Sequence, residues 1–203
     1  MSDDIQALKA DIAFVRGLMD DGGSALARTG AMLVVVGAAF GLVNLQYWLV
    51  YSEILEVPAA WVPWLWLDGA AVAIVAARLI SRRFPTRPSA ASRAMLAAWT
   101  AVGIGATVAG VSLAIGGQRI GFLSLVPAVL PVVLFILYGA AWWVAYAVQR
   151  HVWLALVAAA CFVAAVACAL VMGSPEEWLV IAFGLFLLVA APGVAIVRLA
   201  RRQ

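Results

Sequence analysis

Asp68 is the residue whose type and position most directly suggest chemistry. It is the only acidic residue well inside a long apolar stretch, which runs from about residue 57 to residue 80. Arg78 follows ten residues later, so on a helix Asp68 lies about 15 Å from that arginine and near the bilayer midplane. An ionised side chain there costs about 2.5–3.5 kcal/mol on insertion scales. The position therefore predicts either a proton or cation site or a packed, hydrogen-bonded residue that ties helices together.

Three other polar side chains are candidates to share a cavity with Asp68. Asn44 and Gln46 lie near the outer end of the first apolar stretch. Tyr138 holds the position of Asp68 in a weak internal repeat, in which LYGAA at 137–141 matches LDGAA at 67–71. Amide and hydroxyl groups commonly hydrogen-bond between transmembrane helices. A polar intramembrane site at these four residues is therefore one prediction, and helix–helix hydrogen bonding is the alternative.

The rest of the chain offers little for catalysis. Its one histidine, His151, cannot supply two-histidine haem ligation, and no cysteine or carboxylate cluster suits a metal. Cys161 and Cys168 lie seven residues apart in one apolar stretch, about 10 Å along a helix and too far apart for a disulfide. No serine–histidine pair is placed to form a nucleophile. We therefore expect a non-enzymatic protein without a cofactor or a metal.

Composition indicates that these residues belong to a membrane protein. Of the 203 residues, 67% are hydrophobic and 11% are charged, whereas soluble domains carry roughly 25% charged residues. A bilayer core needs about 20 apolar residues per helix, so six spans leave no room for a soluble catalytic domain. We expect an all-α, polytopic membrane protein with six transmembrane helices, at about residues 31–51, 57–80, 94–115, 121–148, 152–172 and 178–199.

The basic residues predict the orientation of these spans. All but one of the 13 lysines and arginines fall in alternate breaks between spans, and the exception is Arg119. The opposite breaks also hold Glu53, Glu56, Glu176 and Glu177. Cytoplasmic loops retain positive charge, so both termini are expected to be cytoplasmic. The arginines are scattered over four segments, which disfavours the compact basic patch of a nucleic-acid site.

Residues 1–23 are expected to form a cytoplasmic amphipathic helix before a transmembrane domain at 24–203. Its apolar residues recur at steps of three and four and share one helical face: Ile5, Leu8, Ile12, Val15 and Met19. Gly22 and Gly23 are predicted to end it. Residues 1–21 hold five aspartates against Lys9 and Arg16, a net charge of −3. Surface-seeking helices are usually basic, so this acidic helix is predicted to bind a protein groove. That groove belongs to its own bundle, a second copy or a cytosolic partner.

Small residues mark the expected helix contacts. Gly37 and Gly41 lie four apart in the first span, and Gly103 and Gly110 lie in the third. Small residues on one helical face let two helices approach closely. We expect these glycines to serve packing inside the bundle, with contacts between copies as the alternative. The glycine pair at 116–117 is predicted to end the third span.

Three short segments resemble a group of small six-helix bacterial inner-membrane proteins. They are DIAFVRGL at 11–18, YGAAW at 138–142 and the Pro192-Gly193 pair near the end. The resemblance covers the whole chain and implies the same topology in a bacterial inner membrane. It implies no activity, because the group has none assigned.

The sequence favours a non-enzymatic accessory or regulatory protein of the bacterial inner (plasma) membrane. It is expected to present its N-terminal helix, and the Arg82–Arg93 loop, to a partner. The expected partners are membrane lipid and either another protein or a second copy in a homo-oligomer, not nucleic acid. The alternative is a transporter of a small molecule or ion, or the substrate-binding subunit of one, with a polar site around Asp68. A purely structural subunit of a larger complex is a third reading.

Overall fold

The computed structural model describes residues 2–62, 64–83, 90–122 and 124–200, without the side chains of residues 2–26, 59, 90–92 and 125. Its elements are all helical: α1 (Ser2–Tyr51), the 3₁₀ turn η1 (Ala59–Trp61), α2 (Trp64–Arg83), α3 (Ala90–Ile120), α4 (Leu125–Gln149), α5 (Val152–Leu170), α6 (Glu176–Leu185), the π-helical segment η2 (Phe186–Ala190) and α7 (Ala191–Ala200). α6, η2 and α7 follow one another as one span. Within the described ranges, six helices are long and apolar enough to cross a membrane. For the described residues, the prediction of an all-helical fold with six helices long and apolar enough to cross a membrane is confirmed.

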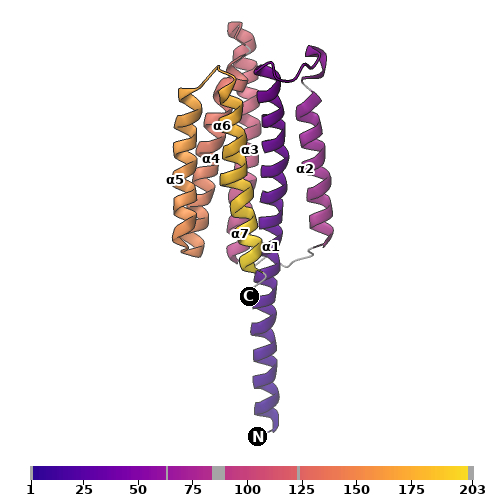
Figure 1. Ribbon diagram of the computed structural model, residues 1–203. Helices are drawn as coiled ribbons and strands as arrows, with labels where there is room; N and C mark the ends of the chain where they lie inside the picture. Colours follow the sequence, from indigo (N-terminus) through magenta and orange to yellow (C-terminus); the bar gives the residue numbers. More distant parts are fainter. Residues whose placement is uncertain (1, 63, 84–89, 123, 201–203) are drawn as a thin grey trace.

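The helices form two groups that close into one bundle. In the first group, α1 packs against α2 and, on another side, against α6, η2 and α7. In the second, α4 packs against α5 and α3. Contacts of α5 with α6, and of α1 with α3, join the groups, while α2 stands at the edge beside α1 (Figure 1). α2 and α3 are the least buried spans, so their outward faces are left to lipid or to another chain.

Glycines hold α1 close to the last span. A Cβ added at Gly30 would lie 2.8 Å from the Gly193 carbonyl oxygen, and one added at Gly193 would lie 2.7 Å from the Gly30 carbonyl oxygen. About two turns and three turns further along α1, Gly37 faces the backbone of Ala190 and Gly41 faces the ring of Phe186. Two of the four glycines selected from the sequence thus lie at an internal helix contact. Gly110 has ordinary contact with Leu130, and Gly103 has no described atom within 4 Å of its added Cβ.

The proline in α7 creates a second link between the two groups. Proline has no N–H, so the carbonyl four residues before Pro192, that of Leu188, loses its helical donor. The indole N–H of Trp142 in α4 donates to the Leu188 carbonyl at 2.9 Å. Trp142 is fully buried, and on the same face of α4 Phe135 packs against Gly184 of α6. An unpaired carbonyl in an apolar interior is costly. The hydrogen bond from the Trp142 indole therefore stabilises the last span at its π-helical segment η2.

Three predicted helix boundaries are wrong. Gly22 and Gly23 lie inside the continuous α1, and the 116–117 pair lies inside α3. A glycine costs only about 1 kcal/mol in a helix relative to alanine. For the 116–117 pair, which lies inside a span, this is less than the cost of leaving backbone groups unpaired in an apolar medium. The third error concerns α2, which begins at Trp64 rather than near residue 57 because residues 59–61 form a 3₁₀ turn after Pro58.

The glycine contact predicts a position-dependent cost of adding one methyl group. In Gly37→Ala the new Cβ would lie 2.6 Å from the Ala190 nitrogen, so the helices must separate, at a cost of about 1–3 kcal/mol in the free energy of unfolding. Gly103→Ala is the matched control, because its Cβ meets no described atom and alanine favours the helix by about 1 kcal/mol. Denaturation of both variants in detergent measures the difference. Equal stabilities would show that the contact is not close.

Because Pro192 and Trp142 act on the same carbonyl, that of Leu188, we expect the effects of substituting them on the free energy of unfolding to be coupled. Trp142→Phe leaves the Leu188 carbonyl without its side-chain donor and should cost about 1–3 kcal/mol. In a Pro192→Ala background position 192 regains an N–H, so the same substitution should cost less. Trp143→Phe is the control, because Trp143 is exposed. A double-mutant cycle of unfolding free energies measures the coupling, and purely additive costs would rule out the shared carbonyl.

Candidate functional site

Asp68 lies toward one end of its helix and faces outward. It follows the first residue of α2 by four positions, so it is about 6 Å from the start of α2 and about 22 Å from Arg83. Its side chain is exposed. The mid-span position expected from a longer second helix is therefore wrong, and the cost of a carboxylate falls toward the helix ends.

Asp68 and Asn44 do not lie close together in the structure. Gly69 is buried against Val43 of α1, and Trp66 contacts the rings of Phe40 and Tyr47. Asp68 is two positions after Trp66, roughly 200° around the helix, so it lies on the opposite face of α2. Asn44 is buried in α1, where its amide donates to the carbonyl of Phe40 at 2.7 Å.

The other two predicted polar residues also lie apart. Gln46 is exposed on α1. Tyr138 belongs to the second group of helices, where its ring contacts Trp99 of α3 at 5.9 Å and Phe135 at 6.1 Å between centroids. Within the described residues, the four predicted residues thus line no common cavity. The hydrogen bond of Asn44 is made within α1, so it is neither part of a shared polar site nor a hydrogen bond between helices.

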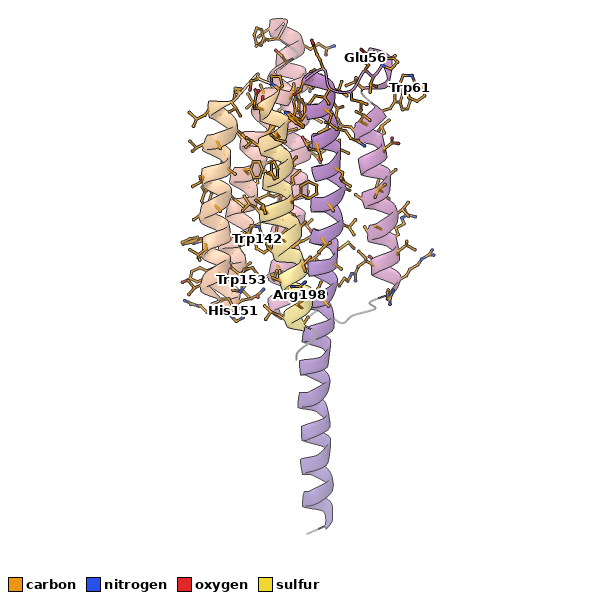
Figure 2. All side chains as sticks on the ribbon, in the orientation of Figure 1. Glu56, Trp61, Trp142, His151, Trp153 and Arg198 are labelled. Atoms are coloured by element: carbon orange, nitrogen blue, oxygen red, sulfur yellow. The ribbon has the colours of Figure 1, made fainter. Side chains whose placement is uncertain are left out.

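The described part of the chain does contain a pocket, at the end of the bundle where Figure 2 labels Glu56 and Trp61. We name this end the Glu56 end and the opposite one, where His151, Trp153 and Arg198 are labelled, the His151 end. The pocket has a volume of about 520 Å³ and lies between the end of α1, the start of α4 and the turn that joins α5 to α6. Because Glu177 at the start of α6 lines it, we name it the Glu177 pocket.

Stacked aromatic rings form one wall of the Glu177 pocket. Trp178 stacks on Tyr47 at 4.7 Å and on Tyr51 at 5.7 Å between ring centroids, and the two tyrosines lie 6.0 Å apart. Tyr47 is also anchored through its hydroxyl, which donates to the Val62 carbonyl at 2.8 Å. Tyr51 and Trp178 line the pocket itself. The stack fixes the wall, because each ring is held by two others.

Glu177, which lines the pocket, has one buried carboxylate oxygen without a described partner. The chain turns at Gly173, whose φ of 81° is left-handed and suits glycine. The N–H of Gly173 donates to Oε2 of Glu177 at 2.7 Å. The other oxygen, Oε1, is buried and has no hydrogen-bond partner among the described residues. Glu177 is only 4% exposed, whereas its neighbour Glu176 is exposed.

No signal in the sequence separates Glu177 from Glu176. Both were expected in the same break between spans. The turn at Gly173 sets which of the two points inward, and that depends on the packing of α1, α4 and α6. A pocket with one carboxylate can bind a ligand, but no group of three or more histidine, cysteine, aspartate or glutamate residues in the described chain can hold a metal ion.

The N-terminal half of α1 forms a second candidate surface. α1 is a continuous helix of 50 residues, and Figure 1 shows its first half extending from the His151 end, away from the other helices. The span within α1 is Ala27–Tyr51, so residues 2–26 add about 35–40 Å of helix. The stripe Ile5, Leu8, Ile12, Val15 and Met19 falls in this projecting segment, and its side chains lie outside the described residues.

Comparison with known proteins does not assign the chain to a family. It matches no protein-family model, no curated protein and no solved structure. The resemblance to small bacterial inner-membrane proteins therefore stays a prediction, and the site must be interpreted from its own geometry.

Because Asp68 is exposed and Asn44 is buried, replacing each with alanine should change the free energy of unfolding by different amounts. Asp68→Ala removes an exposed side chain and should change the free energy of unfolding by no more than about 0.5 kcal/mol. Asn44→Ala opens space at a buried position and removes a hydrogen bond, and should cost about 1–3 kcal/mol. Denaturation in detergent compares them. A large loss of unfolding free energy in Asp68→Ala would contradict this and would mean that the Asp68 carboxyl makes an internal contact.

Proposed function

We propose that the chain is a non-enzymatic accessory protein of the bacterial inner membrane that presents the projecting segment of α1 to a partner protein. The observation that carries the proposal is the continuous α1, whose first half stands clear of the bundle (Figure 1). A segment of that length with an apolar stripe needs a surface to cover the stripe. Its own bundle does not supply one in this arrangement, so a second protein is the better candidate.

The distribution of charge supports a cytoplasmic position for this segment. The segment extends from the His151 end, where Arg150, Arg198 and the Arg82–Arg83 pair also lie. The Glu56 end carries Glu53, Glu56 and the acidic pair that opens α6. Because positive residues are retained on the cytoplasmic side, we infer that the His151 end and both termini are cytoplasmic. The Glu56 end then faces the periplasm.

The chemistry of the segment indicates the kind of partner. Helical spacing places the five stripe residues within an arc of about 80°, and an unbroken helix keeps that arc intact. Five aspartates against two basic residues oppose binding to an anionic lipid surface. An apolar groove with a basic rim fits both properties. We therefore expect a partner with such a groove on its cytoplasmic side.

Transport is the weaker functional hypothesis. It predicted a polar cavity formed by Asp68, Asn44, Gln46 and Tyr138, and these four residues lie on separate surfaces of the described structure. Asn44, Thr100 and Thr107 each donate to a carbonyl of their own helix. No observation on the described residues favours a path for a substrate through the bundle, so we do not propose one.

The proposal predicts that one face of the segment controls partner binding. Ile12→Asp places a charge in the apolar stripe and should lower the amount of partner that co-purifies in mild detergent by about tenfold or more, because a buried unpaired charge is costly. Ala10→Asp is the matched control, since position 10 lies on the opposite face of the same helix. Quantitative mass spectrometry of the purified material measures both.

Two results would contradict the proposal. One is equal recovery of partner with Ile12→Asp, with Ala10→Asp and with a chain that lacks residues 2–21. The other is a chain that purifies as a monomer with no stoichiometric protein in any form. If the protein that is lost is a second copy, cross-linking of two tagged forms identifies a homo-oligomer held by the same stripe.

A further inference from the structure

We propose that the edge between α1 and α2 at the His151 end binds the headgroup of an anionic phospholipid. This inference goes beyond the proposed function, because it concerns the lipid around the spans and not the protein that meets the projecting segment. It rests on a half-buried arginine bonded to the neighbouring helix, two exposed arginines on that helix and an apolar face that leads into the span. We name this edge the Arg28 site, and it consists of Arg28, Arg78, Ser81 and Arg82.

A hydrogen bond to α2 holds Arg28 at the start of its span. The span within α1 begins at Ala27, and α2 ends at Arg83, so Arg28 and Ser81 both lie near an end of the spans, where headgroups lie. Nη2 of Arg28 donates to Oγ of Ser81 at 2.9 Å. A guanidinium group has five N–H donors, and the hydroxyl that accepts this bond can still donate its own proton. The pair can therefore offer further donors to a phosphate.

Two more arginines share the face of α2 that carries Ser81. Arg78, Ser81 and Arg82 are three and four residues apart, a spacing that makes side chains neighbours on a helix. Both arginines are exposed, whereas Arg28 is half-buried. Arginine suits phosphate because its planar group donates two parallel N–H bonds to the phosphate oxygens. Three such groups and a hydroxyl at one edge of the bundle therefore favour a phosphate ligand.

The described carboxylates lie away from the Arg28 site. The acidic residues with described side chains belong to the Glu56 end and to the first turns of α2 and α6: Glu53, Glu56, Asp68, Glu176 and Glu177. On α1 itself, Asp21 comes seven residues before Arg28, about 10 Å along the helix, and its side chain lies outside the described residues. Buried charges are generally paired, and the leaflet on the cytoplasmic side is anionic. A lipid phosphate is therefore the complementary anion.

The face of α1 that carries Arg28 continues into the span as an apolar surface beside α2 (Figure 1). Val35 and Leu42 follow Arg28 at steps of seven residues, which is close to two full turns. Val35 is half-buried, and the Leu42 side chain is 54% exposed. An acyl chain can lie along this surface while its phosphate meets Arg28. A free phosphate ion would use the arginines alone, so the surface favours a phospholipid.

Native mass spectrometry of the full chain in mild detergent tests the proposal. The probes are dioleoyl phosphatidylglycerol, dioleoyl phosphatidylcholine and glycerol phosphate. The first bound phosphatidylglycerol should have a dissociation constant at least about tenfold lower than that of phosphatidylcholine, whose choline cation offsets the phosphate charge. Glycerol phosphate has the headgroup without acyl chains and should also bind at least about tenfold more weakly.

Matched variants locate the binding. Arg28→Gln should weaken phosphatidylglycerol binding by about tenfold, because a charged donor at the centre of the site is lost. Arg78→Gln should weaken it by about fivefold. Arg198→Gln is the control, since it removes the same charge from an exposed position in α7 at the same end of the bundle, and it should bind like the native chain. If Arg28→Gln does not fold, as judged by gel filtration, Arg78→Gln decides the matter, because Arg78 is exposed.

The proposal is overturned if phosphatidylcholine binds as tightly as phosphatidylglycerol, or if Arg28→Gln and Arg78→Gln bind the lipid as tightly as Arg198→Gln. Glycerol phosphate that binds as tightly as the lipid would also overturn it, because the apolar face of α1 would then play no part. A chain without residues 2–21 keeps the Arg28 site and should retain phosphatidylglycerol binding, whereas it should lose the partner protein. Failure of this proposal and failure of the partner-helix proposal are therefore distinguishable.

Discussion

In the apolar interior of a bilayer, every backbone N–H and C=O must find its partner within the protein. This constraint accounts for the continuous α3 through its glycine pair and for the indole that serves the carbonyl freed by Pro192. It also accounts for the polar side chains of the spans. Asn44, Thr100 and Thr107 each donate to the carbonyl four residues earlier in the same helix. Polar groups used in this way are not available to line a cavity, and the four residues considered for a polar site lie apart in the described structure.

The sequence predicted those features that depend on composition and on local spacing. The six spans follow from apolar length, and the separation of acidic from basic ends follows from where the charges fall between spans. The pairing of Gly37 with the last span was only partly accessible, because a small residue indicates a close contact but not its partner. The start of α2 was missed, since the 3₁₀ turn at 59–61 reflects Pro58 and the anchoring of Val62 by Tyr47. The inward rotation of Glu177 was inaccessible, because its neighbour Glu176 has the same side chain and the same local sequence.

The two ends of the bundle differ in what they can bind. At the His151 end, an acidic helix with an apolar stripe extends beyond the spans and suits a protein groove. At the Glu56 end, Tyr51, Glu177 and Trp178 line a pocket between α1, α4 and the turn before α6. The glycine contact between α1 and the last span connects these ends physically, because α1 supplies both the projecting segment and Tyr51, while α6 supplies Glu177 and Trp178. A change in the packing of α1 on α6 would act on the same helix that carries the proposed partner surface.

The account depends on the orientation of the bundle in the membrane, because it assigns the partner helix to the cytoplasm and the pocket to the periplasm. Cysteine labelling in intact cells tests this directly, after the two buried cysteines have been replaced by alanine. Single cysteines at Ser2, His151, Glu56 and Glu176 are treated with a membrane-impermeant maleimide before and after permeabilisation. The account predicts that Glu56→Cys and Glu176→Cys react in intact cells, whereas Ser2→Cys and His151→Cys react only after permeabilisation. The reverse pattern, or labelling of Ser2→Cys from outside, would contradict it.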